Sequence, residues 1–103
     1  MKDLNQEEWR EKTSEDKDAI IIDVRTPEEV EDGFIPGAIN VDIYDAPGFM
    51  NKINSLDKEK NYYIYCKSGG RSSQACAIME QIGFDNTYNL SGGFSQWNGE
   101  KEV

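Results

Sequence analysis

Two runs that are apolar except for Asp23 constrain the fold of this chain more than any other feature. They occupy residues 19–24 and 62–66 and consist mainly of isoleucine and tyrosine. Runs of this length, rich in β-branched and aromatic residues, are typical of strands that are buried on both faces, as parallel sheets require. Shorter strand candidates lie at residues 38–41 and 87–90, and residues 2–4 are a candidate edge strand.

Helical patterns alternate with these strands. They lie at residues 6–12, 27–32, 47–53 and 72–82. The last pattern places Ala75, Met79 and Ile82 on one face, which can pack against a sheet. The alternation predicts an α/β fold, a three-layer sandwich with a central, mainly parallel sheet flanked by helices. With 103 residues, the chain is expected to form one domain over residues 1–103.

The charge and composition exclude several classes of function. A net charge of −9 argues against nucleic-acid or anionic-membrane partners, which are bound by clustered lysines and arginines. With no apolar run long enough to span a bilayer and no secretory signal, the chain is expected to be cytoplasmic. It has two cysteines and no histidine, so we expect no metal, no cofactor and no disulfide framework. Residues 46–79 are locally basic and can attract a small anion.

Cys66 ends the second apolar run, at the edge of a parallel sheet where ligands usually bind. The adjacent glycines Gly69 and Gly70 permit positive φ angles, so that successive N–H groups can form a nest for negative charge. The following helix adds its N-terminal amides. Together with Lys67 and Arg71, these groups are expected to lower the pKa of the Cys66 thiol. A cysteine–histidine protease is excluded because the chain has no histidine.

A structural interpretation of the same residues stays open at this point. Cys66 could be a packed cysteine at a strand end, and the glycine pair could be only a turn before a helix. The catalytic interpretation requires a Cys66 side chain that solvent reaches and that is ionised at neutral pH. Cys76 could resolve an oxidised or persulfidated Cys66, although packing in its helix is the simpler role.

Four segments, taken in order, resemble the signatures of single-domain rhodaneses. They are residues 22–25 with Glu29, residues 33–40, residues 66–72, and residues 90–94 with Trp97. The third segment resembles the active-site loop of that family. The departures are Phe34, where the family commonly has histidine, and Val30, where it commonly has an aromatic residue.

The resemblance implies a five-stranded sheet and a thiosulfate sulfurtransferase. In such an enzyme, sulfane sulfur from thiosulfate or a persulfide donor passes through a persulfide on Cys66 to a thiol or cyanide acceptor. The substrate-binding loop would comprise Lys67, Ser68, Gly69, Gly70, Arg71 and Ser72. The supporting polar residues would be Asp23, Arg25 and Glu29.

Two alternatives to the thiosulfate enzyme remain. One is a sulfur-relay or regulatory module that acts with a protein partner. The other is a phosphatase or arsenate reductase, which the same fold can host. In those enzymes five residues separate the cysteine from the arginine, whereas four separate Cys66 from Arg71 here, which suits a single sulfur better than a phosphoryl group.

Overall fold

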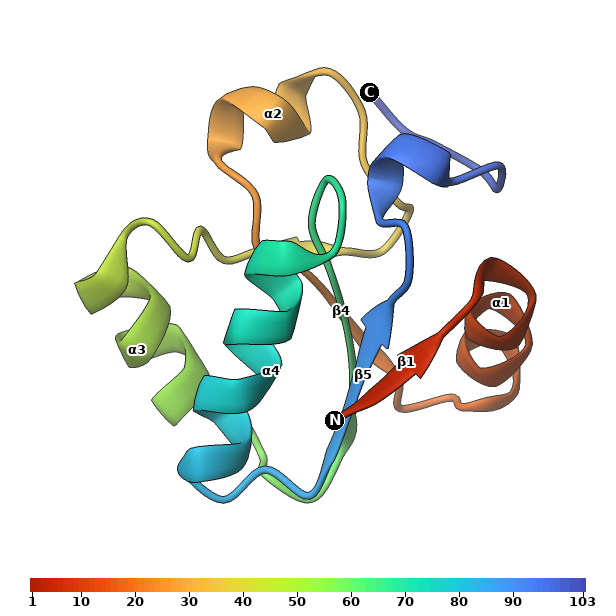
Figure 1. Ribbon diagram of the computed structural model, residues 1–103. Helices are drawn as coiled ribbons and strands as arrows, with labels where there is room; N and C mark the ends of the chain where they lie inside the picture. Colours follow the sequence, from red (N-terminus) through yellow and green to blue (C-terminus); the bar gives the residue numbers. More distant parts are fainter.

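The computed structural model describes residues 1–103 and has a five-stranded sheet at its centre (Figure 1). The strand order is β1-β5-β4-β2-β3, and every neighbouring pair is parallel. The strands are β1 (Lys2–Leu4), β2 (Ile20–Asp23), β3 (Ile39–Asn40), β4 (Asn61–Tyr65) and β5 (Asn86–Leu90). The predicted sheet is therefore confirmed, and it is parallel throughout.

The helices form a layer on each side of this sheet. They are α1 (Gln6–Glu15), α2 (Pro27–Glu31), α3 (Ala46–Asn54) and α4 (Gly70–Gln81). Figure 1 shows α3 and α4 on one face of the sheet and α1 on the other, with α2 near the loop that follows β4. The predicted three-layer sandwich is confirmed. None of the helices combines the length and the apolar character needed to cross a bilayer.

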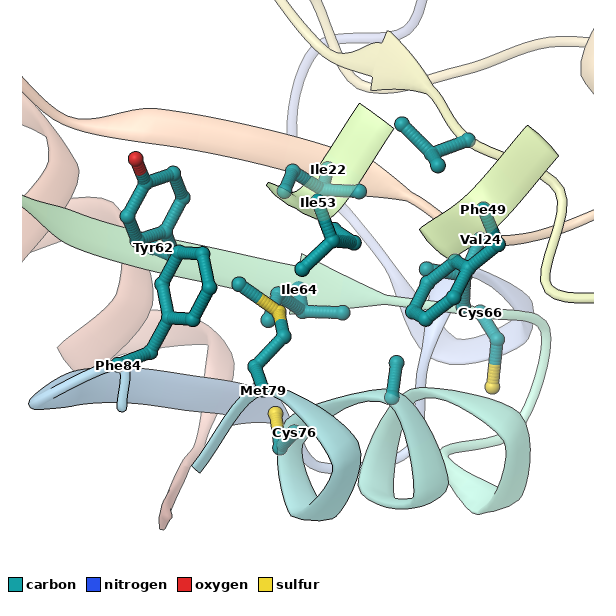
Figure 2. Packing of buried hydrophobic residues seen from close by; sticks show 12 residues of the cluster. Ile22, Val24, Phe49, Ile53, Tyr62, Ile64, Cys66, Cys76, Met79 and Phe84 are labelled. Atoms are coloured by element: carbon teal, nitrogen blue, oxygen red, sulfur yellow. The ribbon is translucent and has the colours of Figure 1, made fainter. Parts of the chain in front are cut away.

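Two buried clusters hold the layers together. On the face covered by α3 and α4, Ile22 and Ile64 of the central strands pack with Phe49, Ile53 and Met79 (Figure 2). The other cluster lies under α1. Its members are Leu4, Trp9, Ile35, Tyr63, Tyr65, Leu90 and Trp97. Burial of this kind contributes about 1.5 to 3 kcal/mol per large apolar side chain, so the central strands are held firmly from both faces.

The C-terminal segment folds back across the sheet edge at which the strands end. After β5 comes a short 3-10 helix, Phe94–Gln96, and Phe34 then exchanges two backbone hydrogen bonds with Glu102, at 2.8 and 2.9 Å. Trp97 is buried, as expected for an aromatic residue that ties down a chain end. Phe34, one of the two departures from the rhodanese pattern, thus anchors the C-terminus through its backbone.

Candidate active site

The loop after β4 turns sharply into α4, and Cys66 lies at its start. Gly69 has φ 110°, a left-handed conformation that favours glycine. It is the N-cap of α4, whose first helical residue is Gly70. The sequence predicted that both glycines could adopt positive φ angles, but Gly70 is already helical. One left-handed residue is enough to turn the chain from the loop into α4.

Hydrogen bonds converge on the sulfur atom of Cys66. The Gly69 N–H donates to Sγ at 3.0 Å, and the Ser72 hydroxyl lies 3.4 Å from Sγ. Burial raises the pKa of the Cys66 thiol, but hydrogen bonds from Ser72 and from the Gly69 and Ser68 N–H groups outweigh it. The net pKa is lowered from the ordinary value of 9.0. The expected direction is therefore confirmed, and backbone amides and one hydroxyl produce it.

Access to the sulfur differs from expectation. Cys66 is only 1% exposed, so the requirement of a solvent-reached side chain is not met in this conformation. Figure 2 shows its sulfur pointing toward the first turn of α4, away from the centre of the apolar cluster. The following loop residues Lys67, Ser68 and Gly70 are exposed, in contrast to Cys66 itself. A sulfur donor can therefore reach Sγ only if the residues around Cys66 move.

The two cations predicted to flank the sulfur have different roles. Lys67 is exposed, and its carbonyl accepts a hydrogen bond from the Ser95 N–H at 2.9 Å. The Arg71 guanidinium binds both carboxylate oxygens of Glu29, at 2.7 and 2.9 Å, and lies over the exposed Tyr44 ring. Glu29 therefore uses two of the five N–H donors of Arg71, and no hydrogen bond joins the guanidinium to the Cys66 sulfur.

The ion pair with Arg71 gives Glu29 a distinct effect on acid stability. Hydrogen bonding to Arg71 lowers the pKa of Glu29 from 4.5 to about 2. A carboxyl group whose pKa falls on folding stabilises the folded protein at pH values above the pKa that the group has in the unfolded chain. For Glu29 this contribution is lost as the pH falls from 4.5 toward about 2. Since both side chains are partly exposed, we expect Glu29→Gln to cost on the order of 1 kcal/mol at neutral pH and to flatten the pH dependence in that window.

Urea unfolding at several pH values measures this difference. The matched control is Glu28→Gln, which removes a neighbouring carboxylate that has no ion pair. If the two variants show the same pH dependence, Glu29 does not carry the effect.

Asp23 and Arg25 form a separate buried ion pair. Arg25 Nη2 lies 2.7 Å from Asp23 Oδ2, and Arg25 Nε contacts both carboxylate oxygens, at 3.0 and 3.1 Å. The Tyr65 hydroxyl donates to Asp23 Oδ2 at 2.7 Å, and the guanidinium also donates to the Gly33 carbonyl. No hydrogen bond joins this pair to the Cys66 sulfur. It instead supports β4 through Tyr65, the residue before the cysteine, which agrees with the structural role that the sequence suggested.

The turn at residues 92–94 supports the Cys66 loop from behind, a contact that was not predicted from the sequence. Phe94 N–H donates to the Cys66 carbonyl at 2.8 Å, and Gly93 packs directly against the same backbone. A Cβ atom added at Gly93 would lie 2.4 Å from the Lys67 carbonyl oxygen. The Gly-Gly pair of residues 92–93 was the available signal, because paired glycines often mark a close backbone approach.

The close approach at Gly93 predicts the effect of a single methyl group. Gly93→Ala places Cβ against the Lys67 backbone and forces alanine into a φ angle of 62°. We therefore expect the free energy of unfolding to fall by more than about 2 kcal/mol and the Cys66 loop to be displaced. Gly37→Ala is the matched control because Gly37 has φ 85° but nothing within 4 Å of an added Cβ. Thermal unfolding of both variants separates the two costs, and equal losses would contradict the close approach.

Cys76 lies in a different environment from Cys66. It is 0% exposed among the apolar residues under α4, and burial raises the pKa of its thiol to about 12. These features agree with a packed helix residue that stays protonated at neutral pH. No group of three or more histidine, cysteine, aspartate and glutamate side chains is arranged to hold a metal ion.

Comparison with known proteins places this site in a family. Residues 6–100 match the rhodanese-like domain. The chain is 38% identical to the putative sulfurtransferase YtwF of Bacillus subtilis (97% of this chain, 93% of the relative). It is 34% identical to a sulfurtransferase of Allochromatium vinosum (94% and 88%). A crystal structure of a rhodanese-like domain protein from Staphylococcus aureus superposes with a TM-score of 0.85 at 35% identity, covering 100% of this chain and 98% of that one. The chain therefore belongs to the rhodanese-like domain family, whose sulfurtransferase members are among its relatives.

Proposed function

We propose that this chain, as one domain over residues 1–103, is a thiosulfate-type sulfurtransferase with Cys66 as its catalytic residue. The observation that carries the proposal is the set of donors around Sγ, namely the Gly69 N–H at 3.0 Å and the Ser72 hydroxyl at 3.4 Å. They stabilise a thiolate without an imidazole base, since the chain has no histidine. The amides of residues 67–72 would bind the sulfur anion, and Arg71 with Glu29 would hold the loop in place.

The proposed reaction has two displacements on sulfur. The Cys66 thiolate attacks the outer sulfur of thiosulfate, the S–S bond of the donor breaks, and sulfite leaves with the electron pair. Cys66 then carries a persulfide anion. In the second step a thiolate or cyanide attacks the terminal sulfur, and the Cys66 thiolate is released. No proton has to move in either step, so the amide nest can serve both without a general acid or base.

Mass spectrometry tests the proposal directly. After incubation with thiosulfate, the protein should gain one sulfur atom, located on the peptide that contains Cys66, and cyanide should remove it as thiocyanate. The peptide with Cys76 should stay unmodified because this thiol is buried and protonated. If neither thiosulfate nor a small persulfide adds sulfur to Cys66, the proposal is wrong.

A second measurement, the rate at which different acceptors remove sulfur from the Cys66 persulfide, identifies the class of acceptor. Since Cys66 is buried, a small acceptor should react faster than a bulky one. If the persulfide forms but is not discharged by cyanide or small thiols, the acceptor is a protein that opens the loop. That result would favour the sulfur-relay interpretation over independent turnover.

A further inference from the structure

Asn89, at the end of β5, lies behind the nucleophile and is not part of the loop. It is 4% exposed, and its neighbour Ser72 is 0% exposed. Its carboxamide oxygen accepts a hydrogen bond from the Ser72 hydroxyl, while Nδ2 donates to Asp3 Oδ1 at 2.9 Å and to Ser73 Oγ at 3.2 Å. A chain of polar contacts therefore runs from the edge strand β1 through β5 to the first turn of α4.

The Ser72 hydroxyl stands at the branch point of this chain. It lies within hydrogen-bond distance of three acceptors: Cys66 Sγ at 3.4 Å, the Gly69 carbonyl at 3.1 Å and Asn89 Oδ1. A serine hydroxyl has one proton, so it can donate to only one of them at a time. The thiolate receives the stabilisation of Ser72 only when the hydroxyl turns away from Asn89.

We propose that Asn89 is a positioning residue that competes with Cys66 for the single hydroxyl proton of Ser72. The inference rests on the proposed function, in which the Cys66 thiolate is the sulfur acceptor. While Cys66 is a thiol, its S–H can donate to Ser72 Oγ and the Ser72 proton can lie on Asn89 Oδ1. When Cys66 ionises, the Ser72 proton turns to Sγ, and the buried Asn89 oxygen loses its donor. Asn89 therefore favours the thiol form.

Asp3 keeps the Asn89 side chain in this competing orientation. Rotating the amide by half a turn would present Nδ2 to Ser72 and free the hydroxyl proton for the thiolate. The same rotation would bring Asn89 Oδ1 against the Asp3 carboxylate, which can only accept. Asp3 and Asn89 are direct register partners in β1 and β5, so the contact is fixed by the sheet itself.

The other charged groups near Cys66 do not use the Ser72 proton. Arg71 of α4 is paired with Glu29 of α2, and Lys67 is exposed in the loop. The remaining donors to Sγ are backbone N–H groups, which cannot be redirected. Ser72 is therefore the one adjustable donor at the sulfur, and Asn89 is its only side-chain competitor.

A double-mutant cycle tests the proposal, with the ultraviolet absorbance of the thiolate followed against pH and Cys66→Ser subtracted as the blank. Asn89→Ala is expected to lower the titration midpoint of Cys66 and to raise the thiolate-to-thiol ratio below that midpoint about 3- to 10-fold. Ser72→Ala is expected to raise the midpoint. In the Ser72→Ala background, Asn89→Ala should cause no further shift.

Asp3→Ala provides an independent variant that is less demanding on folding, because Asp3 is exposed. It should lower the midpoint by less than Asn89→Ala does, and the shift should again require Ser72. An unchanged or higher midpoint in both Asn89→Ala and Asp3→Ala, or the same shifts without Ser72, overturns the proposal. The titration midpoint of Cys66 does not depend on sulfur transfer. If the midpoints shift as expected but the protein takes no sulfur from a donor, only the proposed function is overturned.

Discussion

The Cys66→Ser variant is expected to lose sulfur transfer by about 10³-fold or more, with no measurable sulfur retained on the protein. Serine keeps the Gly69 N–H and Ser72 contacts within reach, but its hydroxyl stays protonated where the thiol ionises. Oxygen in this position also cannot carry a persulfide. Thiocyanate production from thiosulfate and cyanide, combined with intact-mass measurement, checks both expectations.

Cys76→Ala is the matched control for this variant. The Cys76 thiol is buried, and its pKa is raised to about 12, so removing it should leave sulfur transfer unchanged. A modest loss of stability is expected from the small cavity left under α4. Retained transfer in Cys66→Ser, or lost transfer in Cys76→Ala, would assign the sulfur to another residue.

The centre of the sheet was predictable because its two central strands, β2 and β4, come from apolar runs that have few other possible structures. Residues 19–24 and 62–66 became β2 and β4, with ends shifted by one residue. The start of α4 was harder to predict from the sequence: it was expected at Ser72, and the helix begins at Gly70. Glycine is a poor helix former, so propensity places the boundary too late, whereas the left-handed Gly69 fixes it in the structure.

The sequence also indicated the donors at Cys66 but not how the loop encloses the sulfur. Two charged side chains, Lys67 and Arg71, were expected to act on the thiolate. The structure pairs Arg71 with Glu29, which is 42 positions away in sequence, and exposes Lys67. Spacing along the chain reports local geometry, whereas such a pairing depends on how the fold brings Glu29 of α2 to the first turn of α4.

Asn89 shows the same limit more sharply. In the sequence it is a polar residue within a short strand candidate, with no spacing that relates it to Cys66. Its partners Ser72 and Asp3 lie 17 and 86 positions away, and only the strand order brings them together. A polar residue near the end of a buried parallel strand is the one available signal, because that sheet edge usually forms the ligand site.

Among stability changes, Asp23→Ala is expected to have the largest effect, a loss of about 3 to 5 kcal/mol in the free energy of unfolding. Asp23 is 1% exposed and Arg25 4%, so the variant leaves a buried guanidinium without its carboxylate. Tyr65 loses the acceptor of its hydroxyl proton as well. A domain of this size has roughly 5 to 15 kcal/mol of stability in total, so the variant should unfold at much lower urea concentration.

Two further variants separate the ion pair from its surroundings. Tyr65→Phe removes only the hydroxyl between Asp23 and the Ile35 N–H, so it should cost about 1 to 2 kcal/mol. In Asp23→Leu/Arg25→Met no buried charge is left unpaired, and this double variant should be more stable than Asp23→Ala. The double variant is expected to be more stable because most of the stability lost in Asp23→Ala comes from the unpaired, buried charge of Arg25. If Asp23→Ala loses less than about 1 kcal/mol, the pair does not stabilise the fold, and any loss of sulfur transfer in that variant would point to a direct role of Asp23 at the site.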